Sequence, residues 1–155
     1  MKILIAPLNW GLGHATRCIP IIRQYLDQGD EVVLGGDGDS LLLLHRAFPE
    51  LRIINLPSLK LCYDEDAKQR KFYWRSIPVL LRSAIADHYY LRQVLAIERF
   101  DMVISDNRFG FFSKDVHCVY ITHQLYPILP KHLFLFQPLV RWLHARVYNR
   151  YDEVW

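Results

Sequence analysis

The sequence predicts a doubly wound α/β domain built on a parallel sheet, and three observations lead to this fold class. Short segments rich in Ile, Val and Leu alternate with longer segments that have helical periodicity. Continuous apolar strands of this kind are typical of a parallel sheet that helices cover on both faces. The length of 155 residues suits one domain with a full hydrophobic core, and we expect that domain to span residues 1–155.

Six segments have the length and composition of buried strands. They are residues 3–6, 31–35, 52–56, 101–105, 118–122 and 153–155. Four intervening segments predict helices at residues 14–28, 40–47, 76–99 and 133–150. Gly29 ends the first helix, and Ser76 can cap the start of the third. Pro20 lies inside the first helical pattern, so it either kinks that helix or marks its true first turn.

The third helix has the clearest pattern. Its apolar residues recur at helical spacing, which predicts a buried stripe made of Ile77, Leu80, Leu81, Ala84, Ile85, Leu91 and Leu95. His88 falls on this stripe, and we expect a structural histidine with satisfied hydrogen bonds. Residues 57–75, which precede the helix, show no clear period and predict a mobile loop beside the ligand face.

Composition limits the partners open to the chain. Nineteen Lys and Arg nearly balance sixteen Asp and Glu, and a net charge of +3 is too small to argue for nucleic acid. A hydrophobic content of 52% is high for a free-standing domain and points to a face that meets lipid or a second domain. Cys18, Cys62 and Cys118 are far apart and no secretory leader precedes them, which predicts buried thiols in a reducing cytoplasm. No apolar run approaches the roughly 18 residues of a membrane span.

The most informative segment is residues 9–17, Asn-Trp-Gly-Leu-Gly-His-Ala-Thr-Arg, which follows the first strand. Gly11 and Gly13 allow a sharp turn and leave bare backbone for a ligand. The amides of the next helix would point at that ligand, and His14 can move a proton near neutral pH. Sites in such a sheet form at the carboxyl ends of the strands, which selects residues 7–14, 36–39, 106–110 and 123–126.

One interpretation of this turn is a dinucleotide site in an oxidoreductase module. The pattern G-x-G-x-x-G would need glycine where the chain has Thr16, whereas Asp37 at the end of the second strand could serve as the ribose-binding acid. A non-catalytic domain that binds a ligand in the same crevice is a further alternative. No grouping of His, Cys, Asp or Glu has the spacing of a zinc site, so no metal is expected.

Another interpretation couples His14 with Asp106. Each residue follows a strand expected near the centre of the sheet, so both should open onto the same crevice. A carboxylate beside a histidine fixes its tautomer and stabilises the imidazolium, which makes a general base for a hydroxyl nucleophile. The structural alternative is that His14 only begins the helix and Asp106 forms an Asx turn before Asn107. Spacing alone does not separate the two.

Three motifs resemble the amino-terminal half of GT-B glycosyltransferases. They are residues 11–17 (Gly-Leu-Gly-His-Ala-Thr-Arg), residues 103–106 (Val-Ile-Ser-Asp) and residues 120–124 (Tyr-Ile-Thr-His-Gln). The resemblance runs over nearly the whole chain. The branch that the chain resembles contains UDP-glucuronosyl-type enzymes and the MurG-like GlcNAc transferase of the peptidoglycan lipid intermediate.

The resemblance implies an inverting transfer of a sugar from a nucleotide sugar, of the UDP type, to a hydroxyl acceptor, with no metal and no other cofactor. His14 would be the base, and Asp106 would support it. The substrate-binding residues implied are Asn9, Gly11, Gly13, Arg17, His123 and Gln124. The chain would be the Rossmann-like, acceptor-binding domain of a two-domain enzyme. A carboxyl-terminal domain after Trp155 would bind the donor, so the 155 residues alone should not turn over.

The chain departs from the peptidoglycan enzyme near its histidine. That enzyme has a second glycine pair and a proline shortly after the histidine, whereas this chain has one G-x-G after Trp10 and Arg17 at the later position. The acceptor therefore need not be lipid-linked.

Residues 68–75 and 131–150 interleave basic and aromatic side chains. Such a surface can hold an anionic acceptor or lie on anionic lipid, although aromatics at helical spacing usually face a core. We expect the chain in the cytoplasm, with peripheral contact at the inner face of the membrane as an alternative.

Overall fold

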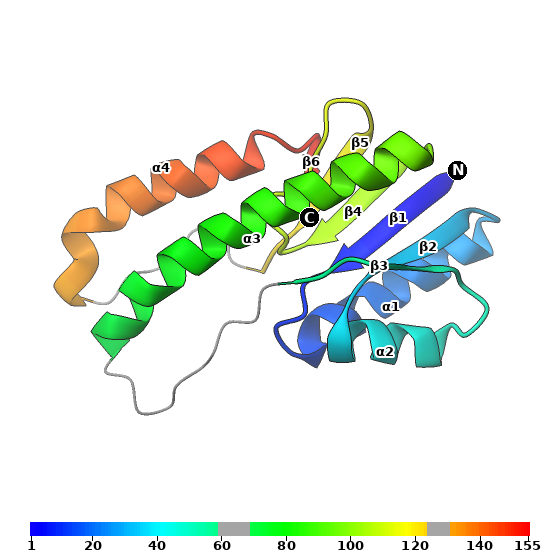
Figure 1. Cartoon of the computed structure of the whole chain (residues 1–155), viewed down its shortest axis with the longest axis horizontal. Helices are drawn as coiled ribbons and strands as arrows, with labels where there is room; N and C mark the ends of the chain where they lie inside the picture. The colour runs from blue at the N-terminus through cyan, green and yellow to red at the C-terminus, as the bar shows by residue number, and fades with distance from the viewer. Residues whose placement is uncertain (59–68, 124–130) are drawn as a thin grey trace.

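A computed structural model describes residues 1–58, 69–123 and 131–155, with the side chains of residues 69–77 and 131–133 outside the described set. Six parallel strands form one sheet in the order β3-β2-β1-β4-β5-β6 (Figure 1). The strands are β1 (Lys2–Pro7), β2 (Glu31–Gly36), β3 (Ile53–Asn55), β4 (Met102–Asp106), β5 (His117–Ile121) and β6 (Glu153–Val154). This order confirms the doubly wound α/β class, and each strand lies within one residue of its predicted ends.

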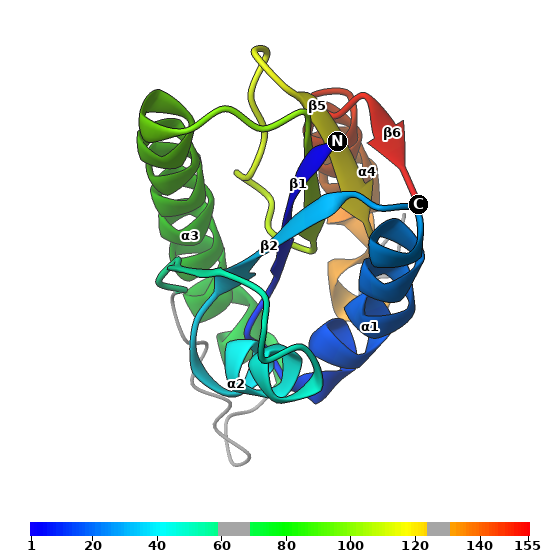
Figure 2. The same cartoon turned by 90° about the vertical axis from the view of Figure 1, so that its right-hand side faces the viewer.

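The described residues form four α-helices, which lie between successive strands except between β4 and β5. They are α1 (Leu12–Asp27), α2 (Gly38–Ala47), α3 (Gln69–Ile97) and α4 (Gln137–Tyr148), the last preceded by the 3-10 helix η1 (Lys131–Phe136). Figure 2 shows α1 and α3 on opposite sides of β1 and β2. The two faces of the sheet are therefore both covered, as continuous apolar strands require.

The core divides into two layers because side chains alternate along each strand. In β1, Ile3 and Ile5 join the cluster that includes Cys18 and Ile22 of α1, while Leu4 and Ala6 join the cluster that includes Leu91 of α3. All of these side chains are fully buried. Cys18 and Cys118 are free, buried cysteines, and Cys62 lies outside the described residues.

Helix α1 settles the position of Pro20. The helix begins at Leu12 and runs through Pro20, so the alternative in which proline marks the first turn is wrong. Pro20 has no backbone N–H, and the carbonyl of Thr16 therefore lacks its usual helical donor. The glycine-histidine turn thus continues directly into the helix, with His14 in its first turn.

Helix α3 differs from its prediction in two ways. It begins at Gln69, so the loop predicted for residues 57–75 is wrong over residues 69–75, and Ser76 does not cap it. Residues 59–68 lie outside the described part of the chain. Leu81 and Ile85, predicted to be buried, are 61% and 71% exposed. Ser83 and Asp87 are buried in their place, because the helix turns a carboxylate toward a buried arginine described below.

Helix α4 begins at Gln137 with proline in its first turn, four residues later than predicted. Residues 131–136 instead form the tighter η1. Among the described residues, no helix is long and apolar enough to cross a membrane.

Candidate active site

The carboxyl ends of β1 and β4 lie side by side, which brings two distant segments together. Pro7 pairs with Asp106 in the register of the two strands, and the amide of Leu8 donates to the Asp106 carbonyl oxygen at 2.9 Å. Helix α1 starts four residues after Leu8 and carries His14 back over this edge. The predicted meeting of His14 and Asp106 therefore occurs at the end of the sheet where ligands bind in open α/β folds.

The His14 ring meets the Asp106 carboxylate through its Nδ1 atom. The distance from Nδ1 to Oδ1 is 3.0 Å. The Asp106 side chain is fully buried, whereas the His14 side chain remains 12% exposed. When Nδ1 carries the proton and donates it to the carboxylate, Nε2 is free to act as a base, which is the arrangement of a histidine base supported by a carboxylate.

Arg17 adds a third member to this group. Its Nε donates to Asp106 Oδ2 at 3.0 Å and its Nη2 donates to Oδ1 at 2.6 Å. The same Nη2 lies 2.9 Å from His14 Nδ1. Parallel bonds from a guanidinium to a carboxylate are strong and fix orientation, so Arg17 neutralises the buried charge of Asp106.

The two glycines of the turn differ in what requires them. Gly11 has φ +100° and ψ 162°, a conformation that is open almost only to glycine. Gly13 is helical, and a Cβ added there would meet no atom within 4 Å. The backbone at Gly13 therefore faces open space beside His14, which leaves room for a ligand.

Asn9 ties the turn to the start of α2. Its Oδ1 accepts a hydrogen bond from the Ser40 amide at 3.3 Å. Gly38 has φ +55°, and a Cβ there would overlap the Asn9 amide nitrogen. Asn9 thus holds the turn against the start of α2. Its role in substrate binding stays a prediction.

The remaining predicted residues lie at the rim or outside the described set. The exposed His123 follows β5, and its ring centroid is 6.2 Å from that of His14. Gln124 lies outside the described residues. Asp37, the acid of the dinucleotide interpretation, has both carboxylate oxygens engaged by the amide and hydroxyl of Ser58 at 2.8 and 2.6 Å. The dinucleotide interpretation therefore gains no support from Asp37.

Sequence reasoning missed the buried ion pair that supports the turn after β4. Arg108 is fully buried, and its Nε and Nη2 donate to Oδ1 of Asp87 in α3 at 2.9 and 2.6 Å. Asn107 adopts φ +57°, a left-handed conformation that asparagine tolerates. The chain thereby aims Asp106 into the site and Arg108 into the core. A signal was present, since Asp87 falls three residues after Ala84 and four before Leu91 on the predicted buried stripe.

Burial shifts several pKa values near the site. Desolvation raises the pKa of the Cys18 thiol to about 12, so this neighbour of Asp106 stays protonated and inert. Desolvation also raises the pKa of Asp87, although Arg108 opposes the effect. His88, the predicted structural histidine, contacts the Phe112 carbonyl oxygen through Nδ1 at 3.1 Å.

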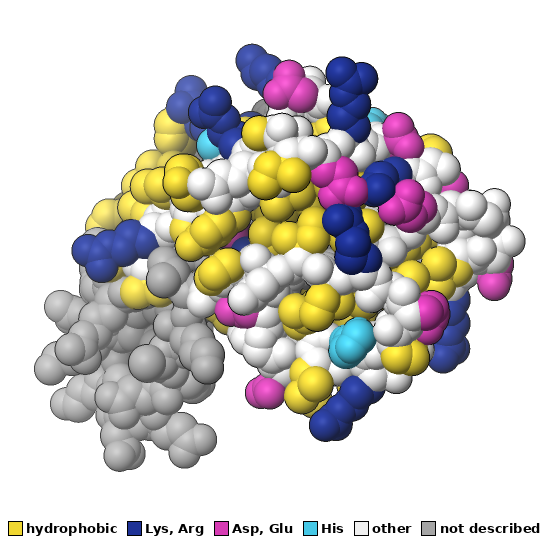
Figure 3. Space-filling model, turned by 45° about the vertical axis from the view of Figure 1, so that its right-hand side comes forward, with side chains coloured by type: hydrophobic (Ala, Val, Ile, Leu, Met, Phe, Trp, Pro, Cys, Tyr) yellow, Lys and Arg dark blue, Asp and Glu magenta, His cyan; other side chains and the backbone are white. Residues whose placement is uncertain are grey.

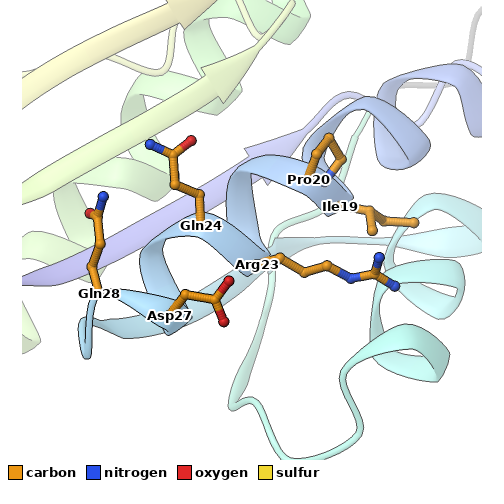
Figure 4. A pocket seen from close by; sticks show the side chains of 6 residues that line it. All are labelled: Ile19, Pro20, Arg23, Gln24, Asp27 and Gln28. Atoms are coloured by element: carbon orange, nitrogen blue, oxygen red, sulfur yellow. The ribbon is translucent and has the colours of Figure 1, made fainter.

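A separate shallow groove runs along the outer side of α1 (Figure 4). Ile19, Pro20, Arg23, Gln24, Asp27 and Gln28 line it. These positions repeat every four residues along one helix, so the groove is the solvent face of α1 and does not include His14 or Asp106. No group of His, Cys, Asp and Glu in the described part of the chain could hold a metal ion.

Comparison with known proteins identifies the fold. No protein-family model matches the sequence, and no curated protein matches it. Among solved structures, the glycotransferase of kitacinnamycin matches with a TM-score of 0.62 at 17% identity, over 97% of this chain and 38% of that one. CalG4, the calicheamicin glycosyltransferase, gives the same TM-score and identity, over 97% and 42%. MurG from Acinetobacter baumannii gives 0.50 at 10% identity, over 99% and 40%.

The chain therefore spans about two fifths of the length of these structures. The likeness covers both layers of helices and the central sheet, since nearly the whole chain aligns. The chain has the α/β, Rossmann-like fold of one domain of the GT-B glycosyltransferases.

Proposed function

We propose that this chain is the amino-terminal, acceptor-binding half of an inverting glycosyltransferase, with His14 as the general base. The observation that carries the proposal is the 3.0 Å contact of His14 with the buried Asp106 at the carboxyl edge of β1 and β4. It is supported by a fold that solved glycosyltransferases share.

In this reaction, Nε2 of His14 takes the proton of the acceptor hydroxyl. The freed oxygen forms a bond to the anomeric carbon of the donor sugar, and the bond from that carbon to the donor phosphate oxygen breaks. A single displacement inverts the configuration at the anomeric carbon and releases the nucleoside diphosphate. Asp106 stabilises the imidazolium that forms, which lowers the barrier to proton transfer.

The acceptor would lie against the open backbone at Gly13, between His14 and His123. The donor, a UDP sugar, would bind chiefly to a second, carboxyl-terminal domain across a cleft. The chain covers only about two fifths of the length of the glycosyltransferase structures it resembles, so those proteins are long enough to contain such a second domain.

The test uses the polypeptide together with any second domain encoded in the same reading frame. Transfer from radiolabelled UDP-glucose and UDP-N-acetylglucosamine to a panel of hydroxyl acceptors is compared for the unmodified protein, His14→Ala and His117→Ala. His117 is a matched control because it lies at the amino end of β5, with a side chain that is 38% exposed and paired with Glu153. Loss of a general base lowers kcat by about 10²–10⁴.

We expect that loss for His14→Ala with donor binding unchanged, and no loss for His117→Ala. Near-normal turnover by His14→Ala would remove His14 from the base role. Transfer by the 155 residues alone would contradict the assignment as half of an enzyme. Titration with NAD tests the oxidoreductase alternative, and we expect no binding.

We place the protein in the cytoplasm, with peripheral contact to anionic lipid through η1 and α4. Residues 116–151 contain no Asp or Glu. Exposed apolar side chains gather on this segment: Phe134, Leu135, Phe136, Leu139, Trp142 and Leu143. Figure 3 shows hydrophobic side chains exposed among basic and acidic side chains on one face of the molecule. Trp142 also stacks under Arg146 at 4.4 Å, a pairing suited to a headgroup interface.

Sedimentation with vesicles tests this contact. We expect binding to phosphatidylglycerol vesicles that falls with salt and is weakened in Trp142→Ala, with little binding to phosphatidylcholine. An equal fraction of protein bound to both kinds of vesicle would refute recognition of anionic lipid. No binding to either would refute lipid contact and favour an apolar protein surface.

A further inference from the structure

The contact between Arg17 and His14 constrains where the imidazole proton lies. An arginine side chain is only a donor of hydrogen bonds. Its Nη2 lies 2.9 Å from His14 Nδ1, and this is a hydrogen bond only if Nδ1 carries a lone pair. In that tautomer the proton of the neutral ring lies on Nε2. His14 would then donate at Nε2 and could not take a proton there.

The contact between His14 and Asp106 makes the opposite demand. Asp106 Oδ1 accepts from Nδ1, 3.0 Å away, only if Nδ1 carries the proton. A neutral ring has one proton to place, so the two arrangements exclude each other. The base-competent tautomer is the one bonded to Asp106, and the contact to Arg17 stabilises the other.

Counting hydrogens shows which contact each tautomer satisfies and which it makes repulsive in the observed geometry. Nη2 carries two hydrogens and has two acceptors in reach, Oδ1 of Asp106 at 2.6 Å and Nδ1 of His14 at 2.9 Å. With the proton on Nε2, Nη2 donates to both acceptors, but the Nδ1 lone pair then faces Oδ1 at 3.0 Å, which is repulsive. Asp106 needs no further donor in this tautomer, because Arg17 already donates to both of its carboxylate oxygens. With the proton on Nδ1, one hydrogen of the cation faces another N–H at 2.9 Å, which is repulsive.

Arg17 is held in this place by the fold. It lies three residues after His14 on α1, so the two side chains share one face of the helix. Asp106 is fully buried and requires a cationic partner, which Arg17 supplies while remaining 30% exposed. The guanidinium is therefore anchored on Asp106 and touches the imidazole as a consequence.

We propose that Arg17 is a positioning residue that selects the tautomer of His14. In the observed arrangement it keeps the proton of the neutral ring on Nε2. The base-competent tautomer forms only when Nη2 leaves Nδ1 and yields the ring to Asp106. The meaning of this for catalysis rests on the proposed function, but the tautomer is a property of this chain without any substrate.

Nuclear magnetic resonance of the 155-residue chain with ¹⁵N-labelled histidine tests the proposal. Two-bond ¹H–¹⁵N correlations above the titration range of histidine show which ring nitrogen is protonated, and the spectrum of His14→Gln assigns the signal. We expect a predominantly Nε2–H tautomer in the unmodified chain and a predominantly Nδ1–H tautomer in Arg17→Met. Arg23→Met is the matched control, because Arg23 lies on the solvent face of the same helix, and should leave the tautomer unchanged.

A predominantly Nδ1–H tautomer in the unmodified chain would overturn the proposal, even if Arg17→Met does not fold. An unchanged tautomer in a folded Arg17→Met would overturn it as well. Neither result depends on activity. A tautomer switch combined with normal turnover of His14→Ala would uphold the role of Arg17 and refute the base assignment, so the two failures are distinguishable.

Discussion

Replacing Asp87 by alanine should lower the free energy of unfolding by about 3–5 kcal/mol, the range for breaking a buried ion pair from one side. The structure places this change toward the upper end. Arg108 is fully buried and Asp87 is 2% exposed, so water cannot compensate the abandoned guanidinium. Its other hydrogen bonds, to the carbonyl oxygens of Leu56 and Pro57, are long at 3.4 Å each.

The measurement is urea unfolding followed by circular dichroism, with Asp27→Ala as control. Asp27 is exposed at the end of α1, and its removal should change stability by no more than about 0.5 kcal/mol. The double variant Asp87→Leu with Arg108→Met should be more stable than Asp87→Ala, because it leaves no unpaired charge in the core. The reasoning would be refuted if Asp87→Ala lost no more stability than the control, or if the double variant were no more stable than Asp87→Ala.

Three further predictions concern the turn and the helices around the site. Gly110→Ala should destabilise by about 1–3 kcal/mol or more in the same assay, because its Cβ would overlap the backbone carbonyl of Ala84, and a neutral effect would contradict this packing. Gly11→Ala should lower the free energy of unfolding by about 1–3 kcal/mol because of backbone strain, whereas Gly13→Ala should raise it by up to about 1 kcal/mol. Equal effects of the two substitutions would contradict this turn conformation. Burial lowers the pKa of His144 below 6.5, so the unfolded state binds more protons than the folded state, and stability is lost as the pH falls below 6.5. His144→Phe should reduce that loss of stability. An unchanged dependence of stability on pH would argue against this role of His144.

Much of the fold follows from patterns that lie within single elements. The apolar run of β1 must be covered on both faces, and its alternation sends Ile5 and Ala6 to different layers of core. The spacing of such runs predicts parallel strands with helical connections, and the carboxyl ends of parallel strands share one edge. For this reason the proximity of His14 and Asp106 was predictable, although they are 92 positions apart.

Prediction failed where a residue's partner lies on a distant element. Periodicity placed Leu81 and Ile85 of α3 in the core, but the helix instead turns Asp87 inward to meet Arg108. An amphipathic pattern reflects only where the apolar residues of a helix lie, whereas a buried charge with a partner can change which face of the helix packs into the core. The start of α3 was likewise missed because residues 69–75 carry no apolar period.

The sequence by itself determined the fold class, the six strands and the edge of the sheet where a histidine and a carboxylate meet, because each depends on local periodicity and on the shared direction of parallel strands. Only the tertiary structure decided how that pair is arranged. The two bonds from Arg17 to Asp106, and its contact with the imidazole, depend on distances between α1 and β4 that no spacing along the chain encodes. Hydrogen bonds and charges act over a few ångströms in space, so the state of His14 is set by neighbours that folding brings together.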